Sequence, residues 1–350
     1  MPPVVSVIMP AFNAERFIGR ALESALNQSL SDVEVIVVDD ASTDSTVDVV
    51  RAIDDSRIRL FEHASNQGPS VARNRALTEA RGDHIAVLDA DDWFRPWRLE
   101  RMLNAMDAHD ADIVADDIYC VNEGATIDLD SGTVRDHRGF PRPLQRLFRS
   151  THLPHVLTAS ELVRGRLPGG NDPRIGLVKP LFRTDFLRST GVRYDPKALY
   201  SQDFAFYLEC LGAGAKFVLI DTVGYCYRGH SGMRSNDDEL IAQKNRLEIT
   251  QKLLQRSYVS TNDGLRQALL DRRARFEAEC RFYRFQKQLE EESTLQAIAS
   301  APTDGLTYAL RILRQRAHRF TGRLGRIPVR LKQLVGWYPT WNELNPSGQN

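Results

Sequence analysis

The chain has 350 residues, of which 42% are hydrophobic and 26% charged, and this balance excludes intrinsic disorder as the default state. With 46 basic and 46 acidic side chains the formal net charge is zero, so nucleic acid is not an expected partner of the whole molecule. The four cysteines form no CxxC pair, which argues against a zinc site or a disulfide framework and favours a reducing cytoplasm.

The first 118 residues predict alternating strands and helices. The β-branched run from Val4 to Met9 predicts a buried strand, and the apolar residues that recur every three to four positions from Phe17 to Leu26 predict a helix. The same patterns predict strands at 33–38, 58–61, 84–88 and 112–118, and helices at 45–53, 70–80 and 97–109. This alternation predicts an α/β domain with a mostly parallel, Rossmann-like sheet and helices on both faces.

Glycine, proline and charged residues dominate positions 119–176, and they predict an irregular insertion. Strands are then expected at 177–182, 217–220 and 223–227, with a helix at 204–211. We therefore place a ligand-binding domain at 1–235 and a helical C-terminal extension at 236–350, with helices at 240–257, 265–289 and 306–320. The opening has no basic-then-apolar leader, and no apolar stretch approaches the ~20 residues that cross a bilayer, so neither a secretory signal nor a membrane span is expected.

Polar residues follow the predicted strands at four places. In an open α/β sheet, ligands bind in the crevice beyond the carboxyl ends of the strands, so these residues are expected to face one cleft. The four segments that contain these polar residues are Pro10, Ala11, Phe12 and Asn13 at the end of the first strand, Asp39 and Asp40 after the second, Asn66 and Gly68 before the third helix, and Asp89, Ala90 and Asp91 after the fourth strand.

Asp89 and Asp91 are one residue apart at a strand end, where two carboxylates can bind one hard cation that also holds phosphate oxygens. Mg²⁺ or Mn²⁺ suits such oxygen ligands and would neutralise the charge that develops on a diphosphate leaving group. The alternative is that Asp91 and Asp92 cap the helix that follows.

Four residues have both a chemical and a structural interpretation. Asp39 could accept hydrogen bonds from a base or a ribose, or could belong to a turn. Arg73 and Arg75 could contact a diphosphate, or could be solvated helix charges. Asp203 could take the proton of an acceptor hydroxyl, or could cap the helix that it begins. The sequence has neither GxGxxG nor GxxxxGK[ST], which argues against dinucleotide and P-loop chemistry.

Together the four strand-end motifs, in this order, resemble those of the inverting glycosyltransferase family 2, whose nucleotide-sugar domain has the GT-A fold. The resemblance covers about the first 230 positions. Within the family, the opening resembles in particular the bacterial succinoglycan-type glucosyltransferases of exopolysaccharide assembly. The resemblance to the family implies that Asp39 contacts the base, that Phe12 lies against the nucleoside, and that Asp89 and Asp91 form the metal-binding DxD motif. It also implies that Asp203 is the catalytic base, with Gln202 where many relatives have Glu, and that His230 is an additional metal ligand.

The implied reaction moves a hexose from a nucleoside diphosphate sugar, such as UDP-glucose, to a hydroxyl of a saccharide acceptor that is linked to a lipid, in one displacement with inversion. Two other functions fit parts of the sequence. A haloacid-dehalogenase-like phosphotransfer enzyme would use Asp89 as nucleophile and Asp91 as acid-base partner, but Trp93 stands where that family usually has Thr or Val. A non-catalytic nucleotide-sugar-binding module would keep the fold without turnover.

The segment 306–337 is basic and amphipathic, and it contains no carboxylate. One interpretation is peripheral contact with the inner face of the cytoplasmic membrane, where aromatic residues near its end favour the interface. The other is an amphipathic helix packed on the protein. The basic residues are Arg311, Arg314, Arg316, Arg319, Arg323, Arg326, Arg330 and Lys332.

Overall fold

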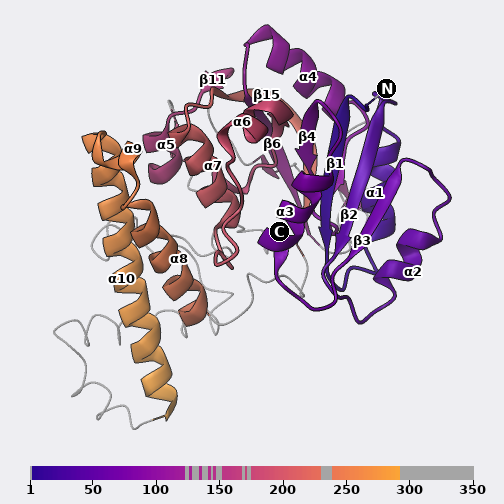
Figure 1. Cartoon of the computed structure of the whole chain (residues 1–350). Helices are drawn as coiled ribbons and strands as arrows, with labels where there is room; N and C mark the ends of the chain where they lie inside the picture. Colours follow the sequence, from indigo (N-terminus) through magenta and orange to yellow (C-terminus); the bar gives the residue numbers. More distant parts are fainter. Residues whose placement is uncertain are drawn as a thin grey trace. The chain divides into compact units, whose positions relative to one another are not determined.

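The computed structural model describes residues 2–122, 126–127, 134–135, 141–142, 145–146, 152–167, 170–171, 175–229 and 239–291. The chain divides into two compact units, Met1–Cys280 and Arg281–Asn350, and the first contains the main sheet (Figure 1). His230 and the segment 306–337 lie outside the described residues, so the predictions made for them stay predictions.

The N-terminal third has the predicted alternation of strands and helices. Its elements are β1 (Val5–Ala11), α1 (Ile18–Leu26), β2 (Val33–Asp39), α2 (Thr46–Arg51), β3 (Ile58–Glu62), α3 (Pro69–Glu79) and β4 (His84–Val87). The strands lie in the order β4-β1-β2-β3, and every neighbouring pair is parallel. Because α1 and α2 lead outwards from β1 while α3 returns to β4, right-handed crossovers place α3 on the face opposite the other two.

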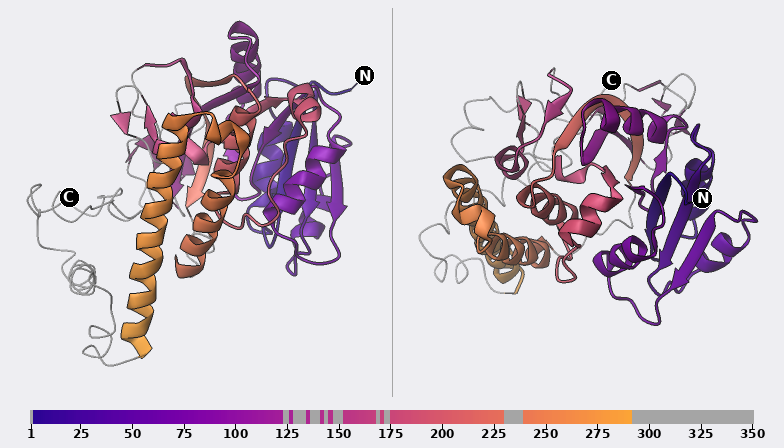
Figure 2. Two further views of the ribbon diagram at one scale, coloured as in Figure 1. Left: turned by 60° about the vertical axis from the view of Figure 1, so that its left-hand side comes forward. Right: turned by 45° about the horizontal axis from the view of Figure 1, so that its top comes forward.

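The sheet continues beyond β4 with strands of both directions. β14 (Leu181–Arg183) lies antiparallel between β4 and β6 (Ile113–Asn122), and β6 pairs in parallel with β15 (Phe217–Gly229). The short strand β5 (Trp93–Phe94) pairs with β15. The helix α4 (Arg98–Ala108), purple at the top of the left-hand view in Figure 2, links β5 to β6. The predicted fold class, an α/β sheet with helices on both faces and a helical C-terminal extension of the chain, is confirmed.

Several elements differ from the prediction. The two strands expected at 217–227 form one strand, β15, whose register against β6 shifts between Leu219 and Tyr225. The segment expected to be irregular contains β11 (His155–Val156) and α5 (Ala159–Arg164), and α6 (Thr184–Thr190) was missed. The remaining described helices are α7 (Gln202–Gly212), α8 (Glu239–Leu253), α9 (Ser257–Ser260) and α10 (Asp263–Glu291). None of the helices in the described ranges is long and apolar enough to cross a membrane.

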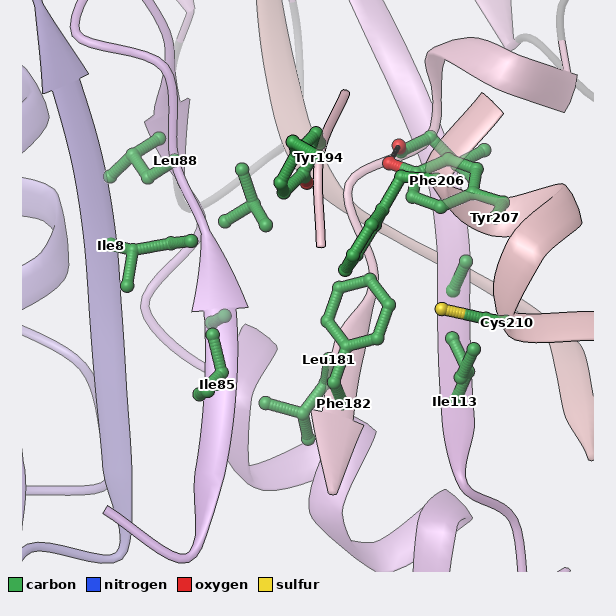
Figure 3. Packing of buried hydrophobic residues seen from close by; sticks show 14 of the residues in the cluster. Ile8, Ile85, Leu88, Ile113, Leu181, Phe182, Tyr194, Phe206, Tyr207 and Cys210 are labelled. Carbon is green, nitrogen blue, oxygen red and sulfur yellow. Dashed lines mark hydrogen bonds between the residues drawn. The ribbon is translucent and has the colours of Figure 1, made fainter. Parts of the chain in front are cut away.

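Aromatic packing fixes α7 against the sheet. The rings of Phe206 and Tyr194 stack with their centroids 4.0 Å apart, and Phe182 of β14 meets Phe206 edge-on at 5.5 Å (Figure 3). Tyr207, the next residue of α7, is also fully buried (Figure 3). Burial of each such side chain contributes about 1.5–3 kcal/mol, so the position of α7, and of Asp203 in its first turn, is set by the core.

Candidate active site

The carboxyl ends of β1, β2 and β4 meet at one edge of the sheet. Ala11 at the end of β1 pairs with Asp39 at the end of β2, and Ile8 pairs with Val87 at the end of β4. This register brings the residues after the three strands together, as the sequence predicted. Phe12 is 46% exposed at this edge, although it is a large apolar side chain.

Asp39 is buried and organises the turn that follows it. Its carboxylate accepts hydrogen bonds from the backbone N–H of Ser42 at 2.9 Å and from the Ser42 hydroxyl at 2.5 Å. The same hydroxyl accepts the N–H of Asn13, and the Asn13 side chain accepts the N–H of Thr43. The turn chemistry that was the alternative for Asp39 is therefore present, and it couples the loops after β1 and β2.

Asp40 uses both carboxylate oxygens to hold the loop before α3. Oδ1 lies 2.8 Å from Nδ1 of His63 and accepts the N–H of Gln67, while Oδ2 accepts the N–H of Gly68 at 2.7 Å. Gly68 has a φ of 88°, which side chains disfavour, so glycine suits this position. Asn66 is exposed beside the loop. The geometry gives Asp40 a structural task in forming the loop.

Asp89 lies between two buried cations. Nη2 of Arg73 is 2.6 Å from Asp89 Oδ1, and Nζ of Lys179 is 2.8 Å from Asp89 Oδ2. Arg73 thus points inward from α3, whereas Arg75 pairs with Glu79 on the outside of the helix. Of the two arginines considered from the sequence, the structure brings Arg73 alone into this cluster.

Asp203 joins the same cluster from the first turn of α7. Its Oδ2 lies 2.6 Å from Lys179 Nζ, and its Oδ1 lies 3.4 Å from Arg73 Nη1 without a hydrogen bond. Two carboxylates and two cations therefore form one group with no net charge, which we call the charge cluster (Arg73, Asp89, Lys179 and Asp203). Its first and last members, Arg73 and Asp203, are more than 100 residues apart in the sequence. The Asp203 side chain thus pairs with two cations, and the N-terminus of α7 has no side-chain cap hydrogen bond.

The cluster shifts the acidity of its members. Burial by itself would raise the pKa of Asp89, but the charges of Lys179 and Arg73 hold that pKa well below its usual range. Burial would lower the pKa of Lys179, but Asp203 and Asp89 raise it above its ordinary value. Asp89 is therefore ionised and Lys179 protonated at neutral pH.

The turn after β4 is fastened to β15. Asp92 is buried and accepts hydrogen bonds from the Tyr225 hydroxyl at 2.6 Å and from the Arg228 N–H at 2.8 Å. The Tyr225 oxygen accepts the N–H of Asp89, and Arg228 Nε donates to the carbonyl of Asp91. Ala90 is buried within this turn. The side chain of Asp92 thus fixes the backbone that carries Asp89 and Asp91.

Comparison with known proteins gives the geometry its context. Residues 6–159 match the family model of glycosyl transferase family 2. The chain is 34% identical over 312 residues to the succinoglycan biosynthesis protein ExoO of Rhizobium meliloti, covering 89% of this chain and 84% of the relative. It is 31% identical to ExoU of the same organism, covering 75% and 72%. The chain belongs to glycosyltransferase family 2.

Solved structures agree with this family 2 glycosyltransferase in fold. S. aureus TarS (residues 1–349) in complex with UDP-GlcNAc superposes with a TM-score of 0.60 at 20% identity, covering 87% of this chain and 83% of that one. A mannosyltransferase from Pyrobaculum calidifontis, in complex with GDP-Man and Mn²⁺, superposes with a TM-score of 0.50 at 17% identity, covering 96% and 84%. The enzyme is therefore a GT-A glycosyltransferase, which contradicts the phosphotransfer alternative.

The carboxylates after β4 could supply some, but not all, of the oxygen ligands that a hard cation needs. In the described ranges, no group of three or more His, Cys, Asp or Glu side chains is arranged to hold a metal ion. A magnesium ion in an enzyme is often bound by one or two carboxylates together with substrate phosphates. Asp91, which is partly exposed, and Asp89 fit that smaller requirement in number, although both oxygens of Asp89 already contact Arg73 and Lys179, just as both oxygens of Asp92 accept hydrogen bonds.

Lys179 was missed from the sequence. A single lysine is usually a solvated surface residue, and this one lies just after the segment that was expected to be irregular. A signal was present, because Lys179 interrupts the apolar run Leu177-Val178-Lys179-Pro180-Leu181-Phe182. A charge within such a run is expected to be buried with a partner.

Proposed function

We propose that this glycosyltransferase moves a hexose from a nucleoside diphosphate sugar to a hydroxyl of a saccharide acceptor, in a single displacement with inversion. The observation that carries the proposal is the charge cluster, in which a carboxylate at a strand end and a carboxylate of α7 share Lys179. Asp89 lies where the donor is expected to bind, at the carboxyl ends of the strands. Asp203 is then the second carboxylate that the displacement needs.

Each residue has a distinct role in this proposal. Asp203 takes the proton of the acceptor hydroxyl as general base, a contribution that is typically about 10²–10⁴-fold. Asp89 and Asp91 would hold a divalent cation, Mg²⁺ or Mn²⁺, which when bound stabilises charge on the leaving diphosphate. His230 is proposed as a further ligand of that cation.

The donor site is proposed to extend from the charge cluster along the edge of the sheet. Phe12, partly exposed, would lie against the nucleoside, while Asp39 would contact its base. The neighbouring residues would complete the pocket for the nucleotide sugar, and they are Pro10, Ala11, Asn13, Asp40, Asn66, Gly68, Arg73 and Ala90.

The donor and acceptor are proposed from the relatives. The UDP-GlcNAc complex of TarS favours a UDP-linked sugar, and the succinoglycan biosynthesis names of ExoO and ExoU favour UDP-glucose or a similar hexose donor. The same names favour an acceptor in exopolysaccharide assembly, which we take to be a lipid-linked polysaccharide intermediate. Contact of the segment 306–337 with a membrane would bring the enzyme to such an acceptor.

Calorimetry with nucleotide sugars tests the proposal. UDP-glucose, UDP-galactose, UDP-GlcNAc and GDP-mannose are titrated with and without Mn²⁺ into the wild type and into an Asp89→Ala, Asp91→Ala variant. We expect one donor to bind in a metal-dependent manner and the variant to lose that binding. The matched control is Asp107→Ala, because the Asp107 side chain is 75% exposed on α4. If no donor binds the folded wild type, the proposal is wrong.

A further inference from the structure

Lys179 is a buried lysine in the loop between the 3₁₀ turn Ile175–Leu177 and β14. Its side chain is 4% exposed, and its ammonium contacts Asp203 at 2.6 Å and Asp89 at 2.8 Å. Burying an ammonium is costly unless it is paired. The two carboxylates compensate for that cost, so the ammonium is a permanent part of the site.

Two hydrogen bonds to the backbone fix the loop that carries Lys179. The Tyr207 hydroxyl donates to the carbonyl of Val178 at 2.6 Å, and Arg98 Nη2 donates to the carbonyl of Lys179 itself. Arg98 is in turn held by Asp116 at 2.7 Å, with both side chains fully buried. The long side chain therefore starts from a backbone that the core holds in place.

The contacts of Asp203 divide its two oxygens. Within the described part of the chain, Oδ2 receives a hydrogen bond from Lys179, and Oδ1 receives none. Arg73 adds charge at 3.4 Å, but its geometry does not make a hydrogen bond to Oδ1. The orientation of the carboxylate thus depends on Lys179.

We propose, on the basis of the proposed function, that Lys179 is a positioning residue that orients the Asp203 carboxylate relative to the donor-side Asp89. By holding Oδ2, the ammonium fixes the orientation of the whole carboxylate, whose Oδ1 is buried and receives no hydrogen bond from the described residues. Because the same ammonium contacts Asp89, it sets the spacing between the donor and acceptor sides. Misplacement of a reacting group by about 1 Å can lower a rate by about 10²-fold.

A double-mutant cycle on donor hydrolysis tests this inference, because water replaces the unidentified acceptor. Release of UDP or GDP from the donor panel is measured for the wild type, Lys179→Met, Asp203→Asn and the double variant. We expect Asp203→Asn to lower kcat by about 10²–10⁴-fold, as removal of a general base does. Lys179→Met should lower kcat by about tenfold or more, and the double variant should be no slower than Asp203→Asn, because Lys179 acts through Asp203.

Controls separate this role from a structural one. Lys252→Met removes a lysine whose partner is Asp195 at 2.6 Å on the surface, and it should leave kcat unchanged. If Lys179→Met does not fold in a thermal melt, Lys179→Arg keeps the charge but moves the donor atom, and it should lower kcat more than it changes KM. Additive losses of kcat in the cycle, or an unchanged kcat in the folded Lys179 variants, would overturn the positioning role of Lys179 and leave the proposed function standing. If the wild type hydrolyses no donor and binds none, the proposed function falls, and this inference with it.

Discussion

Two buried tyrosines beside the site differ in one hydrogen bond. The Tyr207 hydroxyl donates to the Val178 carbonyl at 2.6 Å, whereas the Tyr194 hydroxyl has no hydrogen-bond partner among the described residues. Tyr207→Phe leaves a buried carbonyl unsatisfied, so we expect it to lower the free energy of unfolding by about 1–3 kcal/mol. Tyr194→Phe, the matched control, should change it much less. Urea denaturation followed by circular dichroism measures both, and equal losses would contradict the assignment.

At the residue scale, the sequence predicted correctly the location of residues that directly follow a strand or begin a helix. Asp39 and Asp89 follow buried strands and Asp203 begins a helix, so their gathering at one edge could be anticipated. The sequence could not show which charges pair between distant parts of the chain, as Lys179 does with Asp89 and Arg73 with Asp203. Nor could the sequence show that the Asp40 carboxylate accepts hydrogen bonds from the backbone of the loop that contains Gly68, because those hydrogen bonds depend on the folded backbone.

Within β15, Gly224 is required by what lies against it. A Cβ at this position would lie 2.6 Å from Arg98 Cγ and 2.7 Å from Asp116 Oδ2, inside a fully buried ion pair. Gly224→Ala should therefore lower the free energy of unfolding by about 1–3 kcal/mol through overpacking. Gly19→Ala in α1 has no neighbour closer than 3.7 Å and should be neutral or stabilise by about 0.5–1 kcal/mol. Thermal melts of the two variants test this prediction. A Gly224→Ala variant as stable as the wild type would show that β15 shifts to accommodate the added methyl group.

Elements were predictable in proportion to their length and periodicity. The early strands and helices were found because their apolar residues form continuous or periodic runs. α5 was missed although it carries a capping box, with Thr158 and Glu161 each bonding the backbone of the other. β15 was divided in two because its register shift interrupts the pattern near Asp221, and such a shift depends on the partner strand.

At the scale of the molecule, family and fold followed from the order of motifs, while the domain boundary stays a prediction. The boundary was placed at 235, but α8 lies within the unit Met1–Cys280. Its Asn245 side chain accepts the N–H groups of Leu199 and Tyr200, close before Asp203. Composition changes at 235, yet such tertiary hydrogen bonds cannot be read from composition.

Acid should destabilise the whole molecule, because several paired carboxylates have lowered pKa values in the folded state. These are Glu34, Asp44, Asp55, Asp89, Glu161 and Asp195. A carboxyl with a lowered folded pKa stabilises the protein above its unfolded pKa of about 4, and this stability is lost as the pH falls through the folded value. The urea midpoint should therefore fall steadily below about pH 5.

Glu34 gives this expectation a specific test. Burial alone would raise its pKa, but hydrogen bonds from the Ser6 hydroxyl and the Arg81 N–H, with the Arg59 guanidinium, lower it. Glu34→Gln should cost about 1–3 kcal/mol at pH 7, since it removes the charged acceptor from these donors. Because the wild-type carboxyl loses its charge in acid, the difference between the two proteins should shrink as the pH is lowered towards and below the folded pKa. Urea titrations at a series of pH values measure the difference, and a gap that stays constant into acid would mean that the ionised carboxylate does not stabilise the folded enzyme.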